Sequence, residues 1–129
     1  MSKILTEISA GELLDKISIL EIKLNKISNP GLLNKVKKEY EALSKTKNEH
    51  ITSSKEIEKL YKILKSTNEN LWRIEDEIRL CEKNSDFGDK FIKLARDVYF
   101  TNDKRSKTKL EINKTLGSSI EEVKQYTDY

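Results

Sequence analysis

The stretch 57-IEKLYKILKSTNENLWRIEDEIRLC-81 determines the fold class of this chain. Its apolar residues recur at alternating steps of three and four, the spacing of a helix that keeps one face against a partner helix. Thr67 is the one polar residue in a series that otherwise consists of Ile57, Leu60, Leu64, Leu71, Ile74, Ile78 and Cys81. The stretch therefore predicts a long helix that packs along its whole length in a bundle.

The composition favours the same class. The 129 residues contain four Gly and one Pro, and hydrophobic and charged residues each make up 36%, a balance typical of long helices. We therefore predict an all-α fold of one domain over residues 1–129, an antiparallel bundle of two shorter and two long helices with coiled-coil-like seams and a short C-terminal helix. The expected helices span residues 9–27, 30–50, 54–83, 86–116 and 119–126.

Capping signals set these boundaries. Ser9 and Glu12 match a capping box, in which each side chain bonds a free backbone N–H of the first turn. Gly117 is placed to end the fourth helix, because glycine adopts the left-handed conformation that such ends require. The other expected starts are Asn29 with Pro30, Ser53 or Ser54, Ser85 or Asp86, and Ser118 or Ser119.

The charges limit the classes of partner. Lys and Arg exceed Asp and Glu by 25 to 22, which gives a net charge of +3, and the two signs are interspersed as on a solvated helix surface. This balance disfavours nucleic acid as a partner. Residues 101–114 lean basic, which fits either a solvated face or a phosphate-binding patch.

The absence of several sequence motifs limits the expected localisation and cofactor chemistry. The N-terminus has no apolar signal region, and no run approaches the roughly 20 apolar residues of a membrane span, so we expect a cytoplasmic protein with no membrane partner. Cys81 falls in the helical seam and is expected to be a small buried hydrophobe. The sequence contains no Cys/His cluster and no glycine-rich phosphate loop, so no metal or cofactor is expected. Whether the chain is an enzyme stays open.

The first expected helix is apolar on most sides, which predicts a central position in the bundle. It nevertheless carries Asp15, Lys16 and Glu21. Buried charges are costly unless they are paired. We therefore expect Asp15 or Glu21 to meet an arginine of another helix, such as Arg79 or Arg96.

The seam of the fourth expected helix becomes polar in its middle. Asn102, Arg105 and Lys109 occupy positions where a partner helix should lie, and Arg96 and Tyr99 belong to a second stripe beside them. Such an interruption of an apolar seam is where function is best sought.

The third expected helix has a matching polar feature. Asn68, Trp72, Glu75 and Arg79 line the flank of its seam at steps of three and four. An antiparallel hairpin about residues 84–88 brings Thr67 and Asn68 level with Asn102 and Arg105. The two interruptions are therefore expected to meet in one polar layer.

This layer has two interpretations. It could fix register and oligomeric state, as a single buried Asn does in a coiled coil. Alternatively, its arginines could hold a small phosphate- or carboxylate-bearing ligand. Trp72 and Tyr99 also suit a core, and Glu75 with Arg79 suits an ordinary ion pair within one helix. The candidate ligand-binding residues are Asp15, Lys16, Trp72, Glu75, Arg79, Arg96, Tyr99, Asn102 and Arg105.

Four blocks, GELLDKISILEIKL, LWRIEDEIR, FIKLARDVYFTNDKR and INKTLGSSIEEVKQY, resemble a small uncharacterised family of bacterial and phage proteins. The resemblance covers nearly the whole chain and places most candidate residues inside these blocks, but it implies no activity. The first functional hypothesis is therefore a non-enzymatic interaction or oligomerisation module whose simplest partner is a second copy. The alternative is a binding protein or enzyme with a small anionic ligand in the polar layer.

Overall fold

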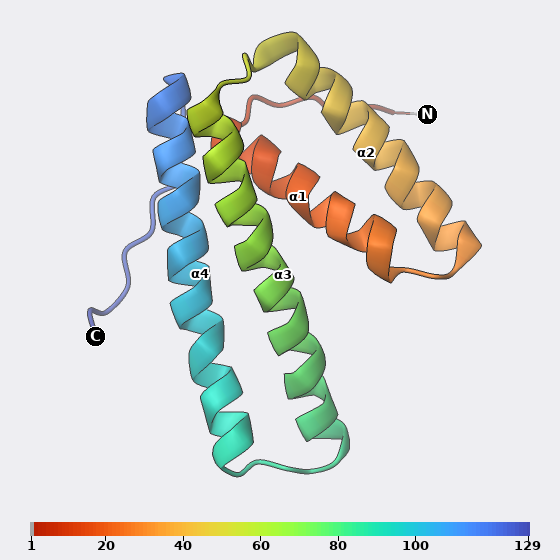
Figure 1. Cartoon of the computed structure of the whole chain (residues 1–129), viewed down its shortest axis with the longest axis vertical. Coiled ribbons are helices and arrows are strands. Elements are labelled where there is room, and N and C mark those ends of the chain that lie inside the picture. The colour runs from red at the N-terminus through yellow and green to blue at the C-terminus, as the bar shows by residue number, and fades with distance from the viewer. Residues whose placement is uncertain (1) are drawn as a thin grey trace.

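The computed structural model describes residues 2–129 and contains four α-helices (Figure 1). They are α1 (Ala10–Lys26), α2 (Pro30–His50), α3 (Lys55–Lys83) and α4 (Asp89–Leu116). No strand occurs within these described residues. The prediction of an all-α bundle with two shorter and two long helices is confirmed.

The helices form two hairpins of unequal length. α3 and α4 run side by side as a long antiparallel pair, and α1 crosses the half of this pair that holds the start of α3 and the end of α4 (Figure 1). α1 packs against the other three helices, whereas α2 packs against α1. The expected central position of α1 is therefore correct.

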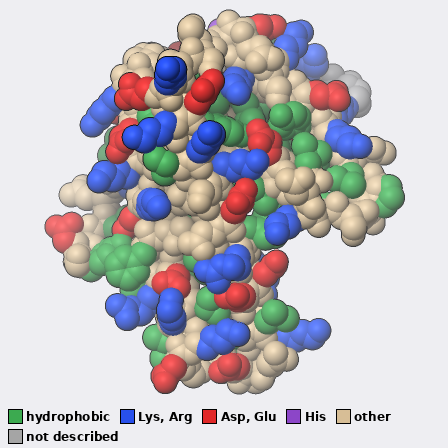
Figure 2. Space-filling view, viewed as in Figure 1, with side chains coloured by type: hydrophobic (Ala, Val, Ile, Leu, Met, Phe, Trp, Pro, Cys, Tyr) green, Lys and Arg blue, Asp and Glu red, His purple; other side chains and the backbone are tan. Residues whose placement is uncertain are grey.

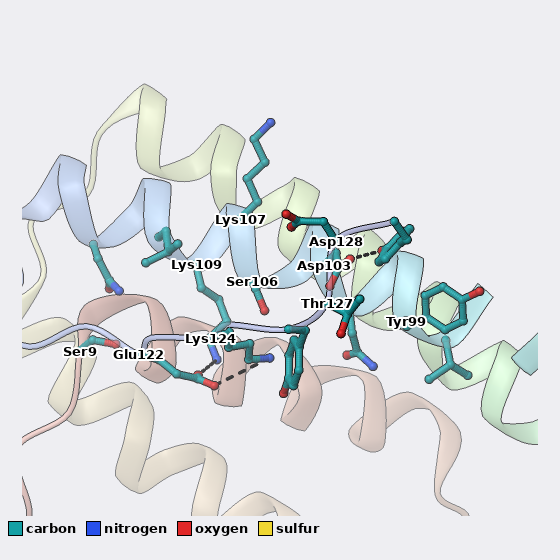
Figure 3. A pocket seen from close by; sticks show the side chains of 16 residues that line it. Ser9, Tyr99, Asp103, Ser106, Lys107, Lys109, Glu122, Lys124, Thr127 and Asp128 are labelled. Carbon is teal, nitrogen blue, oxygen red and sulfur yellow. Dashed lines mark hydrogen bonds and ion pairs between the residues drawn. The ribbon is translucent and has the colours of Figure 1, made fainter. Parts of the chain in front are cut away.

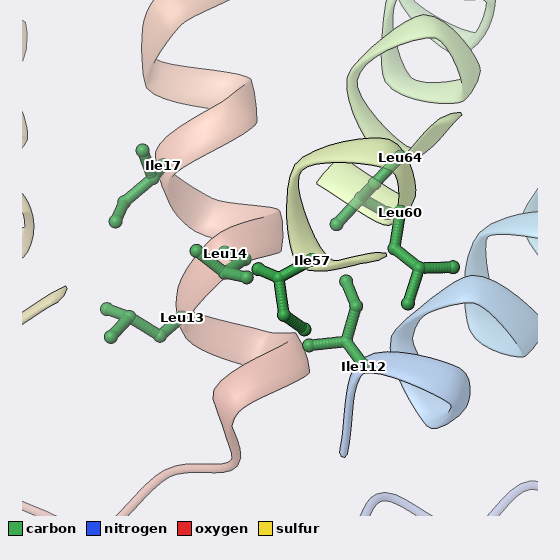
Figure 4. Close-up of a cluster of buried hydrophobic side chains, with 7 residues drawn as sticks. All are labelled: Leu13, Leu14, Ile17, Ile57, Leu60, Leu64 and Ile112. Carbon is green, nitrogen blue, oxygen red and sulfur yellow. The ribbon is translucent and has the colours of Figure 1, made fainter. Parts of the chain in front are cut away.

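The main core lies where α1 meets α3 and α4 (Figure 4). Leu14 and Leu64 have no exposed surface, and Ile112 of α4 closes the cluster. Full burial of such a side chain contributes roughly 1.5–3 kcal/mol of hydrophobic free energy. The complete cluster consists of Leu13, Leu14, Ile17, Ile57, Leu60, Leu64 and Ile112.

A second cluster occupies the other half of the long hairpin. Ile74, Cys81 and Leu94 are buried there, with Ile78, Phe91 and Val98 packed around them. All six belong to α3 or α4, and Figure 1 shows that this half extends beyond α1 and α2. We call residues 74–98 the arm and the remainder of the four-helix structure the body. Cys81 is buried as expected.

The capping signals predicted most helix starts. The side chains of Ser9, Asn29 and Ser54 each accept a first-turn backbone N–H, from Glu12, Leu32 and Ile57 respectively. Gly117 ends α4 in the left-handed conformation with φ 64°. These contacts satisfy backbone groups that a helix end leaves free.

The expected start of α4 at residue 86 is wrong by one turn. Gly88 is the N-cap, and α4 begins at Asp89. Asp86 instead accepts the backbone N–H of Gly88 at 3.2 Å, while its own N–H donates to the carbonyl of Cys81. The Asp86 side chain therefore stabilises the turn between α3 and α4, and the helix starts after that turn.

The expected helix over residues 119–126 is also wrong, because residues 118–129 form an extended segment along α4 (Figure 1). We call this segment the strap. The Ser118 hydroxyl, expected to cap a helix, accepts the backbone N–H of Ala10 at 3.0 Å, and the Ser119 hydroxyl donates to Glu7. The apolar side chains that such a helix would have docked on the bundle also stay exposed, since Val123 and Tyr126 keep most of their surface. Contacts with other segments thus replace the local cap.

Charged side chains of both signs cover the visible face of the molecule, and hydrophobic side chains reach the surface of the arm (Figure 2). Within residues 2–129, no helix combines the length and apolar character needed to cross a membrane.

Candidate functional site

The polar layer lies where α1 crosses α3 and α4. We define it as Asp15 and Ser18 of α1, Asn68 of α3, and Arg105 and Lys109 of α4. Asp15 is 1% exposed and accepts two hydrogen bonds from Arg105, at 2.9 Å from Nε and 2.5 Å from Nη2. Asn68 Nδ2 donates to both the Asp15 carboxylate, at 2.9 Å, and the Ser18 hydroxyl, at 2.8 Å. A single buried carboxylate therefore joins three helices.

Lys109 extends the layer toward the strap. Its ammonium lies 2.7 Å from a Glu12 oxygen, 3.2 Å from a Glu122 oxygen and 3.9 Å from Asp15. Glu12 belongs to α1 and Glu122 to the strap, so one lysine holds both against α4. The capping-box role expected of Glu12 is therefore only half correct, because the Ser9 cap forms while the Glu12 carboxylate pairs with Lys109.

The pKa shifts follow from this pairing. Burial acts to raise the pKa of Asp15, but hydrogen bonds from Arg105 and Asn68 outweigh it, so the pKa lies below its ordinary value of 3.8. The hydrogen bond to Asp15 raises the pKa of Arg105. Burial acts to lower the pKa of Lys109, yet the Glu12, Asp15 and Glu122 carboxylates raise it overall. The layer is therefore fully ionised near neutral pH.

A close approach of backbones lies beside the layer. The N–H of Gly11 donates to Asn113 Oδ1 at 2.7 Å, and that oxygen also accepts the Ser118 hydroxyl. A Cβ at residue 11 would stand 2.5 Å from the Lys109 carbonyl oxygen. Glycine is therefore required where the start of α1 meets α4.

The structure brings three of the candidate residues together. Asp15 and Arg105 form the buried ion pair, and Asn102 accepts a 3.5 Å hydrogen bond from Arg105. Asn68 lies level with Arg105, as the expected antiparallel pairing predicted, since both bind the same Asp15 oxygen. Lys16 lies beside them but is half-exposed, with its ammonium 3.8 Å from Glu12.

The other candidates lie outside the layer. Arg79 pairs with Glu75 of its own helix and is largely exposed. Arg96 lies over the ring of Phe100, with 5.9 Å between the guanidinium carbon and the ring centroid. Trp72 is half-buried. Arg79 and Arg96 were therefore the wrong partners for Asp15, whose arginine is Arg105.

Glu21 has a different partner from the one expected. It accepts a 2.5 Å hydrogen bond from the Tyr61 hydroxyl and lies 3.0 Å from the ammonium of Lys65. Burial and the Glu21 carboxylate raise the pKa of Tyr61. Glu21 thus joins α1 to α3 without an arginine.

Tyr99 belongs to a separate surface feature. Its ring packs edge-on against Tyr129 of the strap, with centroids 5.3 Å apart, and next to Phe100. The Tyr129 hydroxyl donates to Asp103, which raises the pKa of Tyr129 to about 12. These contacts hold the end of the strap on α4.

A cleft of about 1010 Å³ separates the strap from α4 (Figure 3). We call it the strap cleft. Asn102, Ser106, Lys109 and Asn113 line it from α4, Ser9 lines it at the start of α1, and Tyr126 is among the residues that line it from the strap. Lys109 therefore contributes to both the polar layer and this cleft.

Sequence reasoning did not select Gly11, Ser18 or Glu122. Gly11 has a recognisable signal, because it lies in the first turn of a helix that otherwise favours strong helix formers. Ser18 is a polar residue on a mostly apolar helix, which is the same signal that marks Asp15. Glu122 lies three residues after Ser119, a spacing that indicated a helix start and gave no sign of its contact with Lys109.

The buried groups of the polar layer need no ligand to complete their hydrogen bonds. Within the described residues, no fully buried side-chain nitrogen or oxygen lacks a hydrogen-bond partner. Nor do residues 2–129 contain a group of three or more acidic, His or Cys side chains placed to hold a metal ion. The arrangement fixes the crossing of α1 over α3 and α4, and Arg105 already holds a carboxylate in the two-pronged geometry that a ligand would need.

A model of a protein family, described as a family of unknown function (DUF6165), matches residues 4–128. No curated protein and no solved structure matches the chain.

Proposed function

We propose that this chain, which belongs to the family of unknown function DUF6165, is a non-enzymatic helical module that pairs with a second copy of itself through the arm. The observation that carries the proposal is the arm's two-helix construction. Its buried cluster contains side chains of α3 and α4 alone, whereas the body packs α1 against the same pair. Two helices bury less surface than three, so the arm retains apolar surface for a partner.

The exposed side chains of the arm support this reading. Leu80 is 55% exposed, and Phe87 and Ile92 are each 52% exposed. Single exposed apolar residues are ordinary on any surface, but three large ones on one short hairpin favour an interaction site.

One face of α3 continues from the body into the arm without a partner. Asn68, Trp72, Glu75 and Arg79 follow one another at steps of four, three and four, so they share a face of the helix. Asn68 makes the hydrogen bonds to α1 that lie nearest the arm. Beyond it, the same face presents Glu75 and Arg79, whose side chains are 46% and 71% exposed.

The charges on this face favour a second copy as the occupant. Glu75 and Arg79 are one acidic and one basic residue, one turn apart. In a two-fold symmetric pair, each surface meets itself in the opposite direction, so Arg79 of one copy can face Glu75 of the other. The face is therefore complementary to itself.

Sedimentation equilibrium of matched variants tests the proposal. Ile92→Glu places a charge in the arm surface and should convert a dimer to a monomer, because a buried unpaired charge opposes association. Leu32→Glu is the control, since Leu32 of α2 is 51% exposed and lies outside the arm. We expect the control to remain dimeric. A wild-type chain that stays monomeric at high micromolar concentration would overturn the proposal.

Binding of a small phosphate- or carboxylate-bearing ligand in the polar layer stays a prediction. Such a ligand would have to displace the Asp15 carboxylate from Arg105, and Arg79 and Arg96 would have to move to reach it. Self-pairing requires neither change. For that reason we favour the interaction module.

A further inference from the structure

We propose that the strap cleft binds a small uncharged ligand that carries a hydroxylated ring, as sugars and nucleosides do. The cleft lies on α4 between the strap and the N-cap of α1 (Figure 3). The exposed apolar residues of the arm and the face of α3 that we assign to self-pairing do not line it. Its volume of about 1010 Å³ is at the upper end of the range of small-molecule sites, roughly 300–1,000 Å³.

One face of α4 presents a row of polar side chains to the cleft, and some of their hydrogen-bonding groups have no partner in the fold. Asn102, Ser106, Lys109 and Asn113 follow at steps of four, three and four, so they form a single row along the cleft. The Ser106 hydroxyl and the Asn102 amide nitrogen have no hydrogen-bond partner among the described residues. Figure 3 shows the Ser106 side chain extending from α4 toward the strap.

Asn113 gives the strongest indication of a ligand. It is 2% exposed, and its Oδ1 is fully engaged by Gly11 and Ser118. Its Nδ2 has no partner among residues 2–129, although no fully buried polar atom in this part of the chain lacks one. The Nδ2 group therefore reaches the surface, and the surface that Asn113 reaches is the cleft. An unpartnered amide donor on an otherwise buried side chain that lines a cavity can bind an acceptor oxygen of a ligand.

The charges around the cleft favour an uncharged ligand. Its lining contains three lysines, Lys107, Lys109 and Lys124, and three acids, Asp103, Glu122 and Asp128. Lys109 is already held by Glu12 and Glu122, and Glu122 lies 3.7 Å from Lys124. The lining charges therefore balance, and two of the three lysines already have carboxylate partners, so neutral hydroxyl groups suit the free amide and hydroxyl donors better than a charged ligand does.

Tyrosine rings in the cleft can pack against a ring of the ligand. Tyr99, Tyr126 and Tyr129 all line the cleft. Aromatic rings pack against the apolar face of a ring-bearing ligand, and a small number of placed polar groups then fix its orientation. Free amide and hydroxyl groups beside tyrosine rings therefore match a ring that carries hydroxyl groups at its edge.

Nuclear magnetic resonance titration with N-acetylglucosamine, adenosine and inorganic phosphate tests the proposal. We expect saturable shifts of the Asn113 and Asn102 side-chain amide signals with at least one of the first two compounds, and unmoved signals of Leu80, Phe87 and Ile92 in the arm. Response to the sugar alone or to adenosine alone identifies the source of the ring. Saturable binding of phosphate at the same signals would overturn the uncharged assignment, and no response to any compound would overturn the site.

Two variants connect the response to the cleft. Ser106→Leu fills the cleft from a helical position that favours leucine, so the fold should be retained while affinity falls at least about tenfold. Ser66→Leu is the control, because Ser66 lies on α3 outside the strap cleft, and it should bind as the wild type does. Equal affinity of both variants would contradict the proposal. Ile92→Glu, the arm variant, should also bind normally, which separates this site from self-pairing.

Discussion

Asp15 is the residue on which the crossing of three helices depends, because a carboxylate with 1% of its surface exposed is stable only while Arg105 and Asn68 bind it. Removing one partner of a buried pair costs about 3–5 kcal/mol, since an uncompensated charge remains. The lowered pKa of Asp15 means that the wild-type pair contributes stability above pH 3.8 and loses it as the pH falls through the folded-state pKa.

Arg105→Leu reverses this pH dependence. Without the guanidinium, burial dominates and the folded-state pKa of Asp15 rises above its unfolded value. The carboxyl group then favours folding at low pH and opposes it as the pH rises through the raised pKa. We expect a loss of about 3 kcal/mol near pH 7 that becomes smaller toward about pH 5. Urea unfolding at both pH values measures it.

Arg73→Leu is the control for that experiment. Its ion pair with Glu77 is exposed, lies within one helix and is not on the face assigned to self-pairing, so its removal should change stability by less than about 0.5 kcal/mol at either pH. An equal loss of stability in the two variants would show that burial does not make the pair of Asp15 and Arg105 more stabilising than an exposed pair.

At this scale the sequence predicted the layer but not its pairing. Asn68 and Arg105 lie at the same height along the α3–α4 hairpin. That alignment follows from the register of the hairpin, which depends on the position of the loop between its two helices. The partner of Asp15 depends instead on how α1 crosses the hairpin. That angle arises from the packing of side chains such as Leu14, Leu64 and Ile112, and seam spacing within a single helix does not specify it.

Among the elements, α1 and α4 come into close backbone contact at Gly11. Gly11→Ala should destabilise the fold by about 1–3 kcal/mol, because the added carbon would meet the Lys109 carbonyl at 2.5 Å and backbone atoms cannot easily move. This loss opposes the roughly 1 kcal/mol that alanine gains over glycine in a helix. Thermal unfolding followed by circular dichroism measures the result.

Gly31→Ala provides the comparison within α2. There the added carbon would meet only the Asn29 side chain, at 3.3 Å, so the change should lie within about 1 kcal/mol of zero. If Gly11→Ala were equally harmless, the close contact between α1 and α4 would not constrain the fold.

Helix boundaries were predictable wherever the cap is local. Ser9, Asn29 and Ser54 bond groups three residues away, a distance that sequence spacing captures. The strap was not predictable, because its contacts are distant in sequence. Ser118 binds Ala10, and Glu122 binds Lys109, so tertiary contacts replaced the helix that Ser118 and Ser119 would otherwise have started.

The whole molecule divides into a body with three mutually packed helices and an arm with two. Local stability follows the amount of buried contact. We expect amide hydrogens of the arm to exchange faster than those around Leu14 and Leu64, with native-state hydrogen exchange as the measurement. The measurement should use the Ile92→Glu variant, because a second copy bound to the arm would itself protect the amide hydrogens there. Uniform exchange across α3 in that variant would contradict a separate, weaker arm.

The hydrogen bond between Gly11 and Asn113 joins residues that are 102 positions apart. The turn between α3 and α4, by contrast, closes over a few residues. Because closing a long loop costs more chain entropy than closing a short one, the two hairpins can form early from neighbouring contacts. We therefore expect docking of one hairpin on the other, with burial of Asp15, to come last and to limit the folding rate.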